Sequence, residues 1–268
     1  MDNRFDLHHL RVGPEEAPVV LFIHGITESH RYFSRRVAPL AKSFHLLLPD
    51  LPGFGRSPKP VTPYRVDFFV DAVRSLLVRL ELADRPLHLV GHSLGAIIAV
   101  EYAGRFPERI DRLVLLNLPR YSDPDTAHRS FWAGSAAYRK LIQEQSWLAS
   151  LKGARRTGIA GAVRNIWGMP LEVIADCRLF TFQSLTSTLE NCLLNYCVDE
   201  ALAKLPARPT LLLHGERDQV APIESVAELP RRHAHMRLRS FRSAGHHVLH
   251  THPRDCLSLI RSHLAAAS

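Results

Sequence analysis

A serine bracketed by two glycines is the residue of this sequence best suited to nucleophilic chemistry. Ser93 lies in Gly91-His92-Ser93-Leu94-Gly95, between two apolar runs. This pattern predicts a strand, a sharp turn at the serine and a helix, because glycines two residues before and after it have no Cβ to collide. The first N–H groups of the helix and the positive end of its dipole would lie beside the hydroxyl. The motif therefore predicts a nucleophile with a place for negative charge next to it.

An acid and a base that could activate this serine each follow a later apolar run. Asp218 comes after residues 210–215, and His246 comes after residues 236–241. The imidazole could take the serine proton, while the carboxylate could hold the imidazole in the right tautomer and stabilise its charged form. The three residue types together predict acyl-transfer chemistry.

The turn His24-Gly25-Ile26 follows another apolar run and offers a second backbone donor. Glycine lets the chain turn sharply and leaves the N–H of Ile26 free to point into a cleft, where it would form an oxyanion hole with the N–H of Leu94. His24 and Asp50 are polar residues that could be mistaken for a catalytic base and acid. We expect His24 to be a hydrogen-bonded scaffold residue and Asp50 to shape its loop.

Apolar runs alternate with amphipathic segments and predict the elements that position these residues. The predicted strands are residues 7–12, 19–23, 44–48, 87–90, 110–117, 210–215 and 236–241. Helices are expected between them, including one capped by Thr62 ahead of Pro63 and a closing helix over residues 253–264. Strands that alternate with helices pair in parallel, which predicts an α/β fold with a doubly wound, mostly parallel sheet. Its carboxyl edge is where the candidate residues would meet.

Residues 118–204 interrupt this alternation and predict a helical insertion. The segment contains no convincing strand and carries all three tryptophans, Trp132, Trp147 and Trp167. Packing against the core is sufficient explanation for any one of them. Together the aromatic residues indicate a lid whose underside lines an apolar pocket over Ser93. Further candidate pocket residues lie beside the serine and its neighbouring turn: His24, Gly25 and His92.

These motifs resemble those of the α/β-hydrolase superfamily, in its small capped serine esterase and lipase-like branch. The resemblance covers nearly the whole chain outside the insertion and rests on His24-Gly25, Asp50-Leu51-Pro52-Gly53-Phe54-Gly55-Arg56-Ser57, Gly91-His92-Ser93-Leu94-Gly95, Gly215-Glu216-Arg217-Asp218 and Gly245-His246. The chain order serine, aspartate, histidine also matches this fold. The resemblance implies an α/β-hydrolase core over residues 1–117 and 205–268, with a helical cap over residues 118–204 inserted after the sixth strand.

The resemblance also implies a mechanism and limits it. Ser93 would attack an acyl carbon, His246 would move the proton, Asp218 would orient His246, and water would release the acid. The lack of a side-chain donor on Ile26 argues against dehalogenase chemistry. A serine rather than an aspartate at the nucleophile position argues against both dehalogenase and epoxide hydrolase chemistry. Thr251 departs from the family pattern, which often has a glutamate there.

The segment around the candidate base is unusually rich in imidazoles. It contains His246, His247, His250 and His252. The position directly after Gly245 is the catalytic one in the family, which favours His246 over His247. No carboxylate or cysteine lies at ligand spacing from these histidines, so we expect neither a metal site nor a cofactor.

The leading hypothesis is a serine hydrolase that cleaves a carboxylic ester or thioester with an apolar acyl part. The same residues could instead pass the acyl group to an alcohol, amine or peroxide, as an acyltransferase or perhydrolase does, or cleave a carbon–carbon bond. A third possibility is a receptor that binds a small molecule without catalysis. A receptor has no need to retain all three polar residues, which favours the enzyme.

Composition and charge limit the classes of molecule that the protein is expected to bind. The chain of 268 residues is 46% hydrophobic, enough for one domain with a large core, and its formal net charge is +8. An arginine-rich run over residues 231–242 is best explained as a solvated basic face. The alternative is that it attracts the anionic carrier of an acyl thioester. No nucleic-acid-binding motif accompanies it, so no nucleic acid partner is expected.

The compartment is predicted from what the sequence lacks. The N-terminal residues do not have the layout of a signal peptide, and no apolar run is as long as a membrane span. The four cysteines show no metal-ligand spacing, and three of them fall in one helical region, which favours reduced, buried thiols. We therefore expect a cytoplasmic protein.

Overall fold

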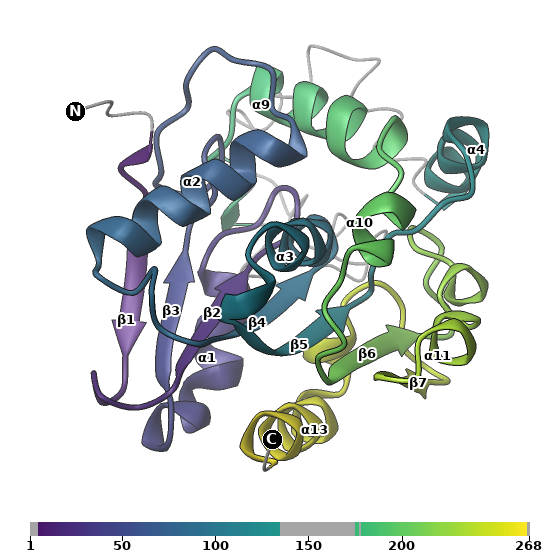
Figure 1. The fold of residues 1–268 in the computed structure, drawn as a ribbon. Helices are drawn as coiled ribbons and strands as arrows, with labels where there is room; N and C mark the ends of the chain where they lie inside the picture. Colours follow the sequence, from purple (N-terminus) through teal and green to yellow (C-terminus); the bar gives the residue numbers. More distant parts are fainter. Residues whose placement is uncertain (1–4, 135–174, 177, 267–268) are drawn as a thin grey trace.

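A seven-stranded sheet runs through the computed structural model, which describes residues 5–134, 175–176 and 178–266 (Figure 1). The strands are β1 (His9–Val12), β2 (Val19–Ile23), β3 (His45–Pro49), β4 (Leu87–His92), β5 (Ile110–Leu116), β6 (Thr210–Gly215) and β7 (Met236–Phe241). Their order is β1-β3-β2-β4-β5-β6-β7; β1 is antiparallel to β3, and every other neighbouring pair is parallel. The predicted doubly wound, mostly parallel sheet is confirmed.

Helices cover both faces of this sheet. They are α1 (Arg31–Val37), η2 (Ala38–Lys42), α2 (Val66–Arg79), α3 (Leu94–Arg105), η3 (Pro107–Arg109), α4 (Pro124–Gly134), α9 (Phe182–Thr188), η5 (Leu189–Leu194), α10 (Asp199–Ala203), η6 (Ile223–Ser225), α11 (Leu229–Arg232), α12 (Val248–Thr251) and α13 (Pro253–Ala265). In Figure 1, α2 and α3 lie on one side of the sheet, and α1 and α13 lie on the other.

The two faces form two hydrophobic cores. Side chains point to alternate faces along a strand, so Leu21 and Ile23 of β2 pack with α2 and α3, while Val20 and Phe22 pack with α1 and α13. Because both faces are covered, the central strands are continuous apolar runs rather than alternating ones.

The start of α2 differs from the prediction. The helix begins at Val66, after Arg65 in an extended conformation, and Thr62 does not cap it. Tyr64 accounts for the difference: its ring is fully buried, and its N–H donates to Ser187 Oγ at 3.0 Å. These contacts hold the segment before Val66 in a turn.

The insertion follows β5, the fifth strand of the described sheet, and not the sixth as predicted. The strands predicted before residue 118 correspond one to one to β1 through β5, so the sixth place did not match the predicted strands themselves. The described parts of residues 118–204 contain helices and no strand. Trp147 and Trp167 lie outside the described residues, as does the side chain of Trp132, whose backbone belongs to α4. The cap boundaries remain a prediction.

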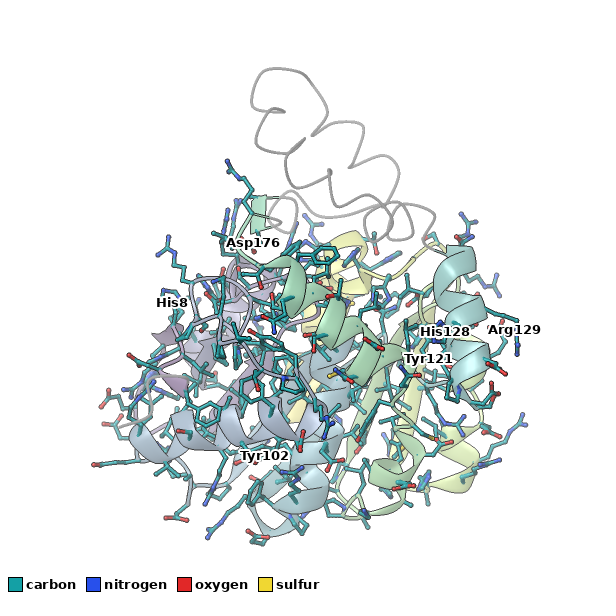
Figure 2. All side chains as sticks on the ribbon, turned by 90° about the horizontal axis from the view of Figure 1, so that it is seen from above. His8, Tyr102, Tyr121, His128, Arg129 and Asp176 are labelled. Atoms are coloured by element: carbon teal, nitrogen blue, oxygen red, sulfur yellow. The ribbon has the colours of Figure 1, made fainter. Side chains whose placement is uncertain are left out.

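Two residues of this insertion, one on either side of residues 135–174, are tied to the core. Figure 2 shows Tyr121 and Asp176 on different sides of the molecule. The Tyr121 hydroxyl donates to the carbonyl oxygen of Val220, whereas buried Asp176 accepts from Ser29 Oγ at 2.5 Å and pairs with Arg31 at 3.1 Å. Tyr121 therefore lies beside the loop that carries Asp218, and Asp176 lies beside the loop after β2.

The arginine-rich run lies at one edge of the sheet. Arg231 and Arg232 belong to α11, and Arg237 and Arg239 are exposed on the edge strand β7. Charged side chains on an edge strand oppose pairing with other chains, which agrees with the interpretation as a solvated face.

The described residues also bear on the predictions about membrane spans and about the cysteines. No helix among the described residues is long and apolar enough to cross a membrane. Cys192 and Cys256 are buried free thiols, as expected, but Cys197 is exposed. Cys177 lies outside the described residues.

Candidate active site

The turn at Ser93 requires glycine on both sides. Ser93 has φ +53° and ψ −118°, a left-handed conformation that few non-glycine residues adopt. A Cβ on Gly91 would lie 2.3 Å from the carbonyl oxygen of Gly95, and a Cβ on Gly95 would lie 1.9 Å from that of Ile23. The strained turn thus packs against both its own helix and β2, which agrees with the turn that the motif predicts.

Gly95→Ala is expected to destabilise the fold by more than about 3 kcal/mol, since the new methyl group overlaps backbone atoms that cannot move aside. The matched control is Gly104→Ala in the same helix, where the nearest atom to a new Cβ is 3.5 Å away. The control should be neutral or slightly stabilising, because alanine favours helices. Thermal unfolding of the two variants measures the difference, and equal midpoints would contradict this account of the turn.

Ser93, His246 and Asp218 form a continuous hydrogen-bonded chain. His246 Nε2 lies 2.9 Å from Ser93 Oγ, and His246 Nδ1 lies 2.8 Å from Asp218 Oδ2. A carboxylate can only accept, so Nδ1 carries the proton and Nε2 of the neutral ring accepts from the hydroxyl. Serine and aspartate are both buried, 2% and 5% exposed. The structure thus brings the three predicted residues together from the carboxyl ends of β4, β6 and β7.

The electrostatics of this chain favour proton transfer to the imidazole. Burial lowers the pKa of His246, but the charge of Asp218 and its hydrogen bond raise it more, so the net pKa lies above the ordinary value. Burial raises the pKa of Asp218, but His246 and the backbone N–H of Ala221 outweigh it, and the net pKa is lowered. The aspartate therefore remains ionised and stabilises a protonated imidazole.

Asp218 is also held by groups that the sequence analysis did not identify. Asn117 Nδ2 donates to Oδ2 at 2.7 Å, and the backbone N–H groups of Val220 and Ala221 donate to Oδ1, both at 2.9 Å. Asn117 directly follows β5 and has φ +49°, which aims its amide at the carboxylate. These three donors fix the plane of the carboxylate that orients His246.

The two backbone donors predicted for the oxyanion hole remain available. Leu94 is the first residue of α3, where N–H groups have no partner within the helix. Among the described residues, no hydrogen bond uses the N–H of Ile26 or of Leu94. Both residues are buried beside the serine loop.

Each ring nitrogen of His24 and His92, two of the predicted pocket residues, faces another group of the protein, and their contact with substrate stays a prediction. His24 donates from Nδ1 to the carbonyl of Gly25 at 2.8 Å and accepts at Nε2 from the N–H of Leu51 at 2.9 Å, which fits a scaffold residue. Burial lowers the pKa of His24, so the ring stays neutral. His92 Nε2 donates to the carbonyl of His246 at 2.8 Å, and its Nδ1 faces a carboxylate. Gly25 has no side chain, and a Cβ at this position would lie 3.0 Å from His92 Nδ1.

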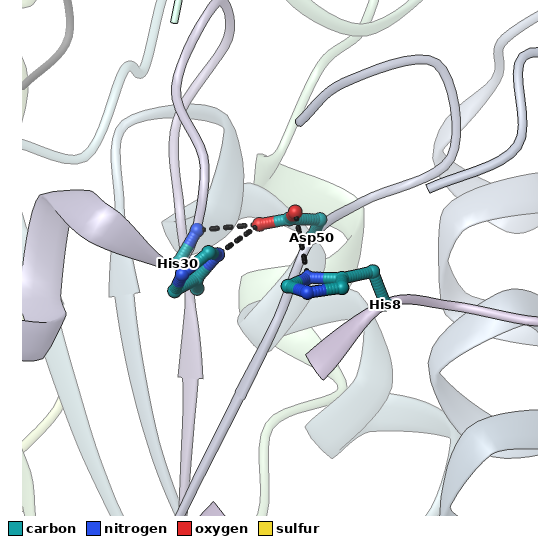
Figure 3. Close-up of side chains that lie close together, drawn as sticks. All are labelled: His8, His30 and Asp50. Carbon is teal, nitrogen blue, oxygen red and sulfur yellow. Dashed lines mark hydrogen bonds and ion pairs between the residues drawn. The ribbon is translucent and has the colours of Figure 1, made fainter. Parts of the chain in front are cut away.

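Asp50 organises the loop that follows β3. Figure 3 shows His8 and His30 directed at its two oxygens, His30 Nδ1 at 2.8 Å and His8 Nδ1 at 3.0 Å. The backbone N–H groups of His30 and Arg56 also donate to it, at 2.7 and 2.8 Å. Burial raises the pKa of Asp50, but these hydrogen bonds and His24 lower it more, and the net shift is downward. The residue shapes its loop, as expected.

Comparisons with known proteins agree with this fold. A family model described as alpha/beta hydrolase fold matches residues 18–133. A cis-3-alkyl-4-alkyloxetan-2-one decarboxylase from Shewanella oneidensis is 28% identical over 259 residues, covering 91% of this chain and 80% of the relative. Monoacylglycerol lipase ABHD6 from Homo sapiens is 24% identical over 273 residues, covering 97% and 79%. A hydrolase structure from Pseudomonas aeruginosa matches with a TM-score of 0.78 and 24% identity, covering 97% of this chain and 94% of that chain.

Proposed function

Because this chain is an enzyme of the α/β-hydrolase superfamily, we propose that it is a serine hydrolase that cleaves a carboxylic ester or thioester with an apolar acyl part. The observation that carries the proposal is the hydrogen-bonded chain from Ser93 Oγ through His246 to Asp218, with contacts of 2.9 and 2.8 Å. Such a chain is the arrangement that activates a serine hydroxyl. The apolar acyl part rests on the aromatic residues of the insertion.

In the proposed reaction, the proton of Ser93 passes to His246 Nε2 while Oγ attacks the acyl carbon. The N–H groups of Ile26 and Leu94 receive the negative charge of the tetrahedral intermediate. His246 then gives its proton to the leaving alcohol or thiol, which leaves an acyl-enzyme. A water that is deprotonated by His246 attacks this ester, and the acid and the free serine are released.

A panel of acyl esters and acyl thioesters that differ in chain length tests the proposal. We expect the wild type to hydrolyse esters and to prefer apolar chains over short polar ones. Product analysis with added alcohol, amine or peroxide distinguishes hydrolysis from acyl transfer, and a diketone substrate tests carbon–carbon cleavage. A thioester preference that disappears at high salt would support attraction of an anionic carrier by the arginines. No turnover of any member, with ligands recovered unchanged, would contradict the proposal and favour a receptor.

The activity is expected to fall at low pH as His246 becomes protonated. His246 must be neutral to act as a base, so kcat/KM is lost as the pH drops through its raised pKa. The midpoint should therefore lie above the value of about 6.5 for an unperturbed histidine. Initial rates across pH with a neutral ester measure it. A midpoint below that of free histidine would contradict the role given to the Asp218 charge.

A further inference from the structure

Three buried ligand atoms converge beneath the catalytic loops. Glu28 lies in the loop after β2, His92 ends β4 one residue before Ser93, and His247 follows His246. Their exposures are 2%, 0% and 8%. One carboxylate oxygen and one imidazole nitrogen from each histidine all lie within 4.8 Å of one another. No metal was expected here from the sequence, because no carboxylate lies near these histidines in the chain; the fold brings Glu28 to them from a segment far away in sequence.

The two ring nitrogens of His92 face different partners. Its Nε2 lies 2.8 Å from the carbonyl oxygen of His246, which only accepts, so Nε2 carries a hydrogen. The other ring nitrogen, Nδ1, is directed at Glu28 Oε1, 3.0 Å away. A carboxylate oxygen and an imidazole nitrogen that face each other in this way can share one metal ion.

His247 directs a second imidazole nitrogen at the same oxygen. Its Nδ1 lies 3.8 Å from Glu28 Oε1 and has no hydrogen-bond partner among the described residues. A buried imidazole nitrogen without a hydrogen-bond partner, directed at a carboxylate, is free to bind a metal ion.

The spacing fits a metal ion rather than a set of hydrogen bonds. Tetrahedral ligands at about 2.0 to 2.1 Å from Zn²⁺ lie about 3.3 Å apart. The separations from Glu28 Oε1, 3.0 Å to His92 and 3.8 Å to His247, fall on either side of this value. The hydroxyl of Tyr32 is also buried without a hydrogen-bond partner among the described residues, and its ring stacks on His92 with centroids 4.3 Å apart.

We propose that Glu28, His92 and His247 bind one divalent transition-metal ion, for which Zn²⁺ is the best match. Two imidazoles and one carboxylate are a common zinc ligand set, with a fourth position left for water. The ion joins three segments: the loop that supplies the oxyanion donor, the strand that ends at the nucleophile and the loop that carries the base. Its role is to hold these segments in register, and it takes no part in the chemical step.

The second histidine and carboxylate cluster, in Figure 3, differs in the hydrogen bonds that its carboxylate receives. Both oxygens of Asp50 receive a backbone N–H, from His30 and from Arg56. His30 Nδ1 also donates to the carboxylate at 2.8 Å, so the contact is already attractive. His8 belongs to this cluster and provides a matched control, because its replacement removes an imidazole without touching the proposed site.

Zinc binding by chelator-treated, tag-free protein tests the proposal. Elemental analysis and titration calorimetry should give about one Zn²⁺ per chain. His247→Gln should weaken binding by about 100-fold or more, whereas His8→Gln should leave it unchanged. Added Zn²⁺ should raise the thermal unfolding midpoint of the wild type but not of His247→Gln.

Two results would overturn the proposal. One is a wild type that binds no Zn²⁺ in the presence of a weak competing chelator, which would assign a shared proton to the gap between Glu28 and His92. The other is a loss of binding in His8→Gln with binding retained in His247→Gln. Both measurements use metal stoichiometry and unfolding, so they are independent of whether the protein hydrolyses esters.

Discussion

Ser93→Ala is expected to lower kcat/KM for an ester substrate by about 10⁴ to 10⁶-fold. The hydroxyl is the atom that forms the covalent bond to the acyl group, and no other described side chain hydrogen-bonds to His246 Nε2 in its place. The residual rate should come from the backbone donors and substrate binding alone. The fold should persist, because alanine removes one oxygen and leaves the turn between Gly91 and Gly95 intact.

Ser43→Ala is the matched control, since this serine is exposed at the end of η2 and is far from the chain of hydrogen bonds. Its kcat/KM should equal that of the wild type. Steady-state kinetics on both variants, with thermal unfolding to confirm the fold, provides the comparison. A Ser93→Ala rate within tenfold of the wild type would exclude the serine as nucleophile.

Asp218→Asn is expected to reduce kcat by about 10⁴-fold with little change in KM. The backbone N–H groups of Val220 and Ala221 would hold the amide oxygen in the place of Oδ1. The amide NH₂ would then face His246 Nδ1 and force the proton onto Nε2. In that tautomer the imidazole cannot accept the serine proton.

The neighbouring amide would strengthen this effect. Asn117 Oδ1 has no hydrogen-bond partner among the described residues, so the side chain can rotate and accept from the new NH₂ group. The control is Asp255→Asn, an exposed carboxylate in the first turn of α13, which should keep full activity. Kinetics of both variants measure the difference. Retention of more than about a tenth of wild-type kcat in Asp218→Asn would contradict a tautomer role for Asp218.

The sheet and the three polar residues could be predicted because both are encoded locally. A buried parallel strand is a continuous apolar run, and a polar residue directly after it reaches the carboxyl edge of the sheet. Asn117 obeys the same rule after β5 and could have been found by it. The start of α2 could not, because the contact of Tyr64 with Ser187 joins segments far apart in sequence.

Contacts between segments far apart in sequence also determine the surroundings of two histidines. The partners of His92, Glu28 and His246, come from loops that only the folded sheet brings together. Local spacing around His247 offered no carboxylate for the same reason. Substrate choice could not be predicted from local sequence patterns, because relatives with this fold include a decarboxylase and a lipase.

The most direct test of the central claim is the reaction of the protein with a fluorophosphonate probe, which modifies only an activated serine. Intact-mass measurement should show one adduct per chain, and peptide mapping should place it on Ser93. The adduct should be absent from Ser93→Ala, slowed strongly in His246→Gln and unchanged in Ser43→Ala. No adduct in the wild type, or an adduct on another serine with ester hydrolysis retained in Ser93→Ala, would contradict the account.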